Sequence, residues 1–128
     1  MSSYLTIYGI REEKRFSILS FSRNHSLYQE LSDNLSIQWD TEYELTESGI
    51  DNVMKELNKQ LETLNTKITE YKLNANGNLD VINEIISLKE YRGELEYDKA
   101  YLYIILGMIS ETKYGDENKF DKIVCKID

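Results

Sequence analysis

The sequence predicts an α+β fold, in which a small antiparallel sheet of three or four strands carries a long antiparallel helical hairpin. Apolar and polar residues alternate near both ends of the chain, which is typical of strands. Two helical repeats follow one another in the middle. With 128 residues, 41% of them apolar, the chain can bury one ordinary core. We therefore expect a single domain over residues 1–128, with the sheet at about 3–45 and 119–128 and the helical arm at about 46–112.

The N-terminal segment predicts a β-hairpin followed by a short helix. Residues 4–10 and 16–22 alternate in polarity, and the charged stretch 11–14 between them suits an antiparallel turn. Ser26 stands three residues before Gln29, which is the spacing of a capping box. This spacing predicts a helix that begins at Ser26 and ends near residue 33.

Two further segments alternate in polarity. Between Leu35 and Leu45, apolar and aromatic residues alternate with polar and acidic ones, which predicts a third strand with one acidic face. A loop with scattered aromatic residues would show a similar pattern. Residues 120–127 alternate again and predict a last strand, on which Cys125 falls on the apolar side. A free cysteine in that position usually serves as a small apolar side chain.

The strongest pattern is a heptad seam that predicts the first long helix. Eight apolar residues follow one another at alternating spacings of four and three: Ile50, Met54, Leu57, Leu61, Leu64, Ile68, Tyr71 and Ala75. Thr46 can cap the start of this helix, with Leu45 and Ile50 as a hydrophobic staple across the cap. The dipeptide Asn76-Gly77 can end it in a left-handed conformation. The helix would contain about 26 residues and measure about 39 Å.

A second long helix is predicted after Asn78, which can cap it. Two rows of residues repeat every seven positions: Val81, Leu88, Leu95, Leu102 and Ile109, and beside them Ile86, Gly93, Ala100 and Gly107. We expect the small residues of the second row to let the two helices approach closely. The short turn between the helices makes them antiparallel neighbours. Residues 100–109 are apolar nearly all round, which predicts that this end is buried on the sheet while the Asn-Gly tip lies in solvent.

Composition excludes several classes of site. A net charge of −8 argues against a surface that binds nucleic acid directly. One Cys and one His exclude a disulfide framework, a Cys-rich zinc site and a multi-histidine metal site. Neither a glycine-rich phosphate loop nor a nucleophile elbow is present in the sequence. We therefore expect a protein that is not an enzyme and that holds no cofactor or metal.

Three weaker constellations have simpler structural explanations. Glu90, Glu94 and Asp98 share a helical face and could hold a cation, but we expect a solvated acidic face, since Arg92 and Lys99 lie nearby and no His is close in the sequence. The polar stretch 22–26 could bind an anion at a helix N-terminus, although helix capping accounts for it. A nucleophilic pair of Cys125 with the single histidine would require the last strand to lie near that histidine.

The distribution of charge singles out one segment. Residues 24–54 contain no Lys or Arg and seven acidic residues, and they hold the only Trp. An acidic surface with aromatic anchors can steer onto a basic partner and bury its aromatic rings there. We therefore predict a partner-binding surface formed by Trp39, Asp40, Glu42, Tyr43, Glu44, Glu47 and Asp51. The alternative is that Trp39 faces the core and the acids only confer solubility.

These features together predict a non-enzymatic protein–protein interaction module. The abundance of Tyr, Ile, Asn and Lys and the absence of Pro are typical of an AT-rich genome. With the small size, they suggest a phage or mobile-element accessory protein or inhibitor that docks on a larger basic, nucleic-acid-handling protein. One alternative is a self-assembling protein that forms a homodimer through its helical hairpin, and another is a small-ligand binder. With no targeting segment or membrane-length apolar stretch visible, we expect a cytoplasmic protein without membrane contact.

Overall fold

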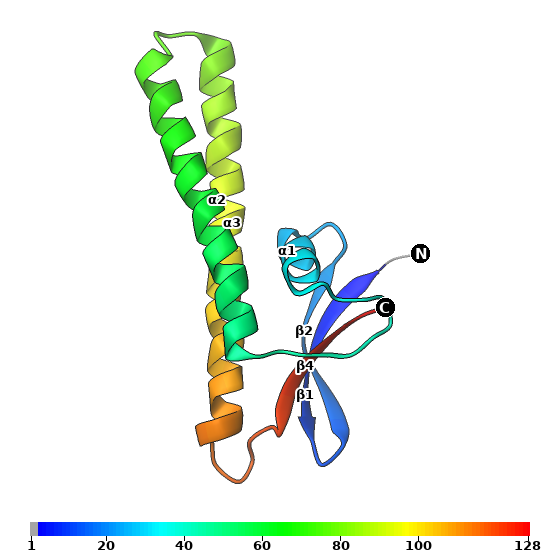
Figure 1. The fold of residues 1–128 in the computed structure, drawn as a ribbon. Helices are drawn as coiled ribbons and strands as arrows, with labels where there is room; N and C mark the ends of the chain where they lie inside the picture. The colour runs from blue at the N-terminus through cyan, green and yellow to red at the C-terminus, as the bar shows by residue number, and fades with distance from the viewer. Residues whose placement is uncertain (1–2) are drawn as a thin grey trace.

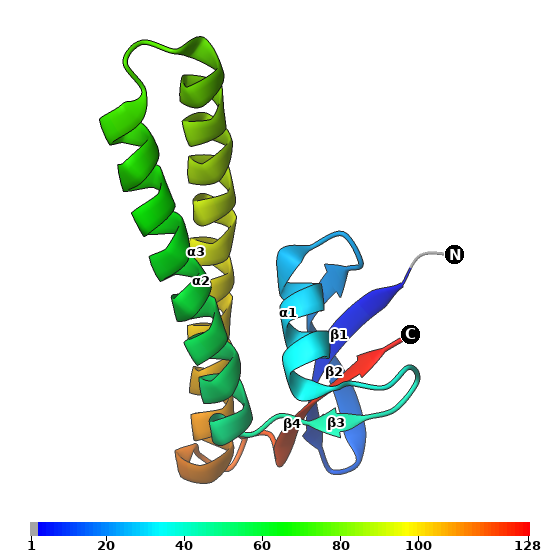
Figure 2. The same ribbon diagram turned by 45° about the horizontal axis from the view of Figure 1, so that its top comes forward.

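The computed structural model describes residues 3–128 and confirms the α+β class. Its sheet has four strands in the order β2-β1-β4-β3, and every neighbouring pair is antiparallel. The elements in chain order are β1 (Tyr4–Arg11), β2 (Lys14–Ser22), α1 (Ser26–Leu35), β3 (Tyr43–Glu44), α2 (Glu47–Asn74), α3 (Leu79–Tyr114) and β4 (Lys122–Ile127). Helices α2 and α3 lie side by side as one long hairpin, whose turn projects away from the sheet (Figures 1 and 2).

The sheet forms where the alternation predicts strands at both ends of the chain. Strands β1 and β2 are joined by Glu12 and Glu13, whose positive φ angles of 51° and 66° match the primed turn that suits a two-residue hairpin. The C-terminal strand β4 inserts between β1 and β3. Its residues Ile123, Cys125 and Ile127 are buried against the helices as the pattern predicts.

A bulge in β2 interrupts the alternation of this strand and sets the position of Phe16. Ile7 pairs with Leu19 but Tyr8 pairs with Ser17, so Ile18 is an extra residue between them. Phe16 is thereby opposite Gly9, and its ring centroid lies 5.9 Å from that of Phe120.

Gly9 is expected to be intolerant of a side chain. A Cβ atom built on Gly9 would lie 2.6 Å from the Phe120 ring, so that ring would have to move out of its packed position. We expect Gly9→Ala to lower the unfolding free energy by about 1–3 kcal/mol, as overpacking usually does. Urea denaturation would measure this. Gly93→Ala is the contrasting variant, because no atom lies within 4 Å of its added Cβ and alanine is favoured over glycine inside a helix, so it should not destabilise the protein. Equal stability of the Gly9 variant and the wild type would contradict the prediction.

The predicted third strand between Leu35 and Leu45 is mostly wrong. Helix α1 continues to Leu35 and ends at Ser36, whose φ of 52° is left-handed. Asp40 also has a positive φ of 55°, and two such residues interrupt an extended chain. The regular strand is therefore reduced to Tyr43–Glu44, with one isolated parallel bridge from Trp39 to the end of β4.

The predicted capping box of α1 is also wrong. The N-cap is His25, whose Nδ1 accepts a hydrogen bond from the Leu27 N–H at 3.1 Å. Ser26 does not cap the helix, because its hydroxyl donates to Asp98 on α3. The Ser26 side chain, which the local pattern assigns to the helix cap, makes a tertiary contact with α3 instead.

The arm follows the heptad prediction closely on α2. Thr46 caps the helix by accepting the Gly49 N–H at 3.1 Å, and Leu45 and Ile50 are both buried beside the cap. The seam residues of α2 from Ile50 to Ile68 are buried. Gly77 has the predicted left-handed conformation, with φ of 74°. Asn78 then caps α3 by accepting the N–H groups of its second and third residues.

The predicted orientation of α3 is half right. In the first row Leu95, Leu102 and Ile109 are buried and the two residues nearer the tip are half-buried. The second row, Ile86, Gly93, Ala100 and Gly107, does not face α2; it is exposed apart from a half-buried Gly93. The expectation that residues 100–109 are buried all round is likewise wrong. Helix α2 and the sheet lobe lie beside α3 on two sides (Figure 2), and the exposed residues of the second row show that a third side is left to solvent within the described chain.

Candidate partner-binding site

Trp39 lies on the loop between α1 and β3, at the edge of the sheet. Its backbone is anchored there, because the Asp40 N–H donates to the Ile127 carbonyl at 2.8 Å and Trp39 itself forms a bridge to Ile127. The Thr41 hydroxyl donates to the Trp39 carbonyl at 3.3 Å. Trp39 nevertheless remains 61% exposed. The structure thus presents the only Trp of the chain to solvent on a fixed backbone, which answers the question of whether this ring is core or surface.

A groove of about 460 Å³ lies beside the Trp39 indole. Tyr28 and Ile37 contribute its apolar walls, and Arg23 and Asp33 contribute charges of opposite sign. The Tyr28 hydroxyl shares a 2.7 Å hydrogen bond with the Ser3 hydroxyl, which holds the ring in place. Most of the groove lining is polar, and its apolar surface comes from Tyr28, Ile37, Ile127 and the Trp39 ring.

The acidic residues of the predicted surface are partly neutralised within the chain. Asp40 lies 3.1 Å from the Lys126 ammonium, and Glu42 lies 2.5 Å from the Arg15 guanidinium. Both pairs adjoin the Trp39 loop. Such half-exposed ion pairs contribute little to stability, but they reduce the net charge that a partner would meet.

The seven predicted residues divide into two groups. Trp39, Asp40 and Glu42 lie on the loop, followed directly by Tyr43 and Glu44 on β3. Glu47 and Asp51 belong to the start of α2, where the Glu47 carboxylate lies 3.9 Å from Lys113 near the end of α3. Tyr43 is half-buried opposite Cys125, whereas Glu44 and Asp51 are exposed.

The sequence reasoning missed a buried acidic cluster where α1 meets α3. Asp98 is only 1% exposed, so the expectation of a solvated acidic face is wrong for this residue, although Glu90 and Glu94 are exposed. The Ser26 hydroxyl donates to Asp98 Oδ2, and among residues 3–128 Oδ1 has no hydrogen-bond partner. Burial raises the pKa of Asp98, while Ser26 and His25 act in the opposite direction. The sequence contained a signal for the burial of Asp98, because position 98 continues the buried row of residues 102, 105 and 109 at spacings of four and three.

Glu30, on α1, is close enough to Asp98 for the two charges to interact. Among the carboxyl groups of the described chain, its pKa is shifted furthest from the usual value. Burial raises the pKa of Glu30 to about 8, and the negative charge of Asp98 adds to the effect. Its Oε2 atom is buried without a hydrogen-bond partner in the described part of the chain. This carboxyl group is therefore neutral through much of the range below pH 8.

Together, Ser26, His25 and Asp98 have the composition of a catalytic triad but not its geometry. In a triad the histidine accepts the proton of the serine hydroxyl. Here Ser26 donates to Asp98 instead, and His25 Nδ1 is occupied by the Leu27 N–H. Nδ1 lies 3.8 Å from Asp98 Oδ1, beyond hydrogen-bonding distance. In this arrangement His25 does not accept the Ser26 proton. Cys125 is equally unsuited to nucleophilic chemistry, because burial raises the pKa of its thiol to about 12.

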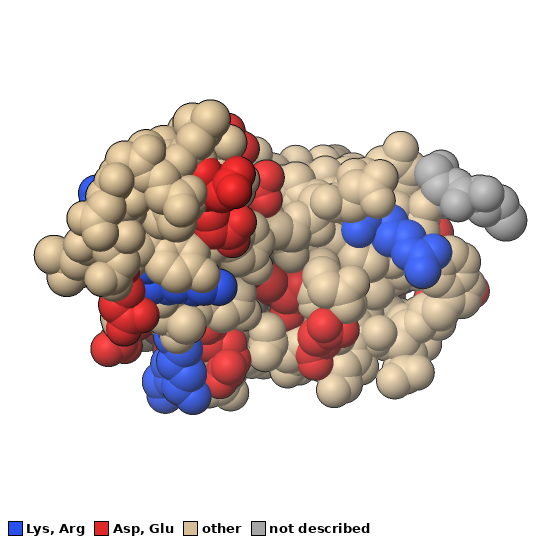
Figure 3. All heavy atoms as spheres, turned by 90° about the horizontal axis from the view of Figure 1, so that it is seen from above, with Lys and Arg blue, Asp and Glu red and all other residues tan. Residues whose placement is uncertain are grey.

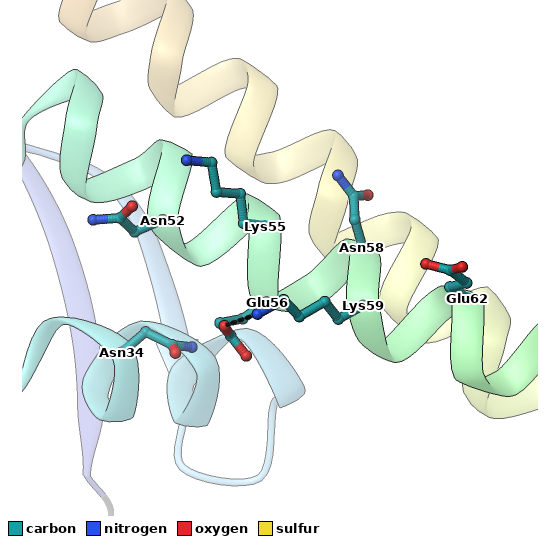
Figure 4. Close-up of a pocket in the computed structure, with 7 residues that line it drawn as sticks. All are labelled: Asn34, Asn52, Lys55, Glu56, Asn58, Lys59 and Glu62. Carbon is teal, nitrogen blue, oxygen red and sulfur yellow. Dashed lines mark hydrogen bonds and ion pairs between the residues drawn. The ribbon is translucent and has the colours of Figure 1, made fainter.

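A further cleft of about 490 Å³ separates α1 from α2 (Figure 4). Asn34 on α1 faces the pair formed by Glu56 and Lys59, whose charged atoms are 3.2 Å apart, while Lys55 and Asn58 point away from α1. Its side chains are polar and of mixed charge, which makes the cleft a solvated gap. Figure 3, seen from the tip of the arm, likewise shows acidic and basic side chains in separate small groups rather than one charged field.

The chain was compared with protein-family models, curated proteins and solved structures. No protein-family model, no curated protein and no solved structure matches it. Within residues 3–128, no His, Cys, Asp and Glu side chains gather in a group of three suited to a metal ion. None of the described helices combines the length and the apolar character that crossing a membrane requires.

Proposed function

We propose that the protein is a non-enzymatic interaction module that binds a larger protein through the Trp39 surface, meaning Trp39, Asp40, Glu42 and the adjoining groove. The observation that carries this proposal is a tryptophan held by backbone hydrogen bonds and still 61% exposed. Tryptophan is strongly enriched among the residues that dominate binding energies. A rigid backbone also lowers the entropy that such a residue loses on binding.

The partner we propose is basic and handles nucleic acid, as would suit a phage or mobile-element inhibitor. The support is the absence of Lys and Arg from residues 24–54, which surround Trp39 in the sequence. Since Asp40 and Glu42 already have cationic partners, we expect charge to raise the association rate more than the final affinity. We assign this interaction to the cytoplasm.

Two alternatives are tied to other parts of the molecule. A self-assembling protein would use the exposed side of α3. A small-ligand binder would use the pocket of about 300 Å³ beside Asp98, which Tyr97 and Tyr101 also line. Neither of these requires the Trp39 surface, so the functions can be separated by mutation.

We expect Trp39→Ala to weaken partner binding about 30-fold or more, as loss of an interface hot spot does. The partner would first be isolated by affinity capture from a low-GC bacterial lysate and then purified for kinetic binding measurements. Reversing Asp40 and Glu42 to Lys should lower the association rate and flatten its dependence on salt.

Leu73→Ala serves as the control, because Leu73 is 77% exposed at the tip of the arm and should leave binding unchanged. Retention of full affinity by Trp39→Ala would exclude this surface as the site. Capture of small molecules only, or of no partner, would favour the alternatives.

A further inference from the structure

The exposed side of α3 has the composition of an interface rather than of a solvated helix face. The residues that form this outer face are Ile86, Gly93, Tyr97, Ala100, Ile104 and Gly107. They recur at helical spacings and so lie along one side of α3. Ile86, Tyr97 and Ile104 are 51%, 74% and 53% exposed, although each is large and apolar or aromatic. Large exposed apolar residues spaced along one side of a helix often mark a contact with another molecule, and here the charged residues Lys89, Glu90 and Glu111 interrupt or border them.

Neither packing nor backbone conformation inside the monomer requires glycine at Gly93 or Gly107. A Cβ atom built on Gly93 or Gly107 meets nothing within 4 Å, and neither residue has a positive φ. Glycine in a helix interior is unfavourable compared with alanine. What glycine offers at an exposed helix position is a close approach for a second backbone. The pair therefore points to another helix seated on this face.

Two charged residues indicate how that helix would run. Lys89 and Glu111 are both exposed, border the outer face and make no ion pair within residues 3–128. Each lies eleven positions from Ala100, and Gly93 and Gly107 each lie seven positions from it. An antiparallel second α3 centred on Ala100 would place Lys89 beside Glu111 twice and Gly93 beside Gly107 twice. A parallel pair would instead place like charges together.

We infer that a second copy of this chain covers the outer face of α3, with the two helices antiparallel about a twofold axis at Ala100. This contact is isologous, so it closes as a dimer. The neighbouring Lys72 lowers the pKa of the Lys89 ammonium, through a side-chain hydrogen bond and through charge repulsion. A carboxylate placed beside Lys89 would offset this repulsion.

The overlap is long enough for a specific but modest dimer. From Ile86 to Tyr114 the paired helices would run about 43 Å, and a helix is about 12 Å wide with its side chains. The two copies together would bury roughly 1,000 Å², near the lower end for specific interfaces. We therefore expect a dissociation constant in the micromolar range.

The test is sedimentation velocity of the full chain from about 1 µM to 500 µM. The wild type should shift from monomer to dimer across this range. Lys89→Glu and Glu111→Lys should each weaken the dimer about tenfold, because every contact between these positions then joins like charges. Combining both changes in one chain should restore dimerisation, and mixing the two single variants should give heterodimers.

A second variant tests the apolar part of the face. Ile104→Glu should abolish the dimer, whereas Leu73→Glu, at an even more exposed apolar residue of the arm tip, should leave it intact. Circular dichroism confirms that each variant retains its helices.

A wild type that stays monomeric at 500 µM would overturn the inference. Single charge reversals that leave the dimer unchanged would overturn the antiparallel arrangement. All these variants keep the Trp39 surface, so their outcome is independent of the partner-binding proposal.

Discussion

Replacing Ile105 by alanine is expected to lower the unfolding free energy by about 2–5 kcal/mol, whereas the same change at Ile104 should alter it by less than about 1 kcal/mol. The two residues are neighbours on α3 and chemically identical. Ile105 is fully buried in the core shared by the arm and the sheet, whereas Ile104 is 53% exposed. Truncation at 105 therefore leaves a cavity among packed side chains, and truncation at 104 removes atoms that already contact water.

The comparison needs urea denaturation at a low protein concentration, where association does not add to stability. Identical denaturation slopes for the wild type and both variants would show that each variant unfolds from a similarly compact state. Equal losses at the two positions would mean that α3 is rotated from its observed orientation. That result would also remove the basis for the outer face.

Replacing Glu30 by glutamine is expected to stabilise the protein at pH 8 by about 1–3 kcal/mol and to have little effect near pH 4.5. Burial, assisted by the charge of Asp98, raises the pKa of Glu30 from 4.5 to about 8. Between these values the folded chain keeps a proton that the unfolded chain loses. The contribution of Glu30 to stability is therefore greatest below pH 4.5 and is lost as the pH rises through 8. The full shift would correspond to a larger energy, but the partial solvent contact of Glu30 reduces it.

Unfolding free energies measured from pH 4 to 9 for the wild type and Glu30→Gln would check this linkage. The difference between the two proteins isolates Glu30 from the other titrating groups. Glu62→Gln is the control, since Glu62 is exposed on α2 and should leave the pH profile unchanged. A constant difference across this range would mean that Glu30 is not buried as described. The contribution of Asp98 to the unfolding free energy should also decrease as the pH rises, because burial raises the pKa of its carboxyl group too.

The candidate site could be predicted in part from the sequence. The charge distribution singled out the segment around Trp39, and the side chain is indeed presented to solvent. The pairing of Asp40 with Lys126 and of Glu42 with Arg15 could not be foreseen, because it depends on which strands become neighbours. The Asp98 cluster was hidden for a similar reason: a single carboxylate in a helix gives no sign of whether the facing side is water or protein.

Local sequence determined the strands at the two ends of the chain and the two long helices. Alternation specifies the strands at the two ends, the heptad seam specifies α2, and Thr46 and Asn78 specify where the helices begin, because backbone and capping preferences act within a few residues. Only the tertiary structure decided which side of α3 is covered and that residues between Leu35 and Tyr43 form a loop. Apolar residues suit a core and an interface equally well. Their burial depends on where neighbouring elements end, and here α2 and the sheet lobe cover two sides of α3 and leave Ile86, Ile104 and Gly107 exposed.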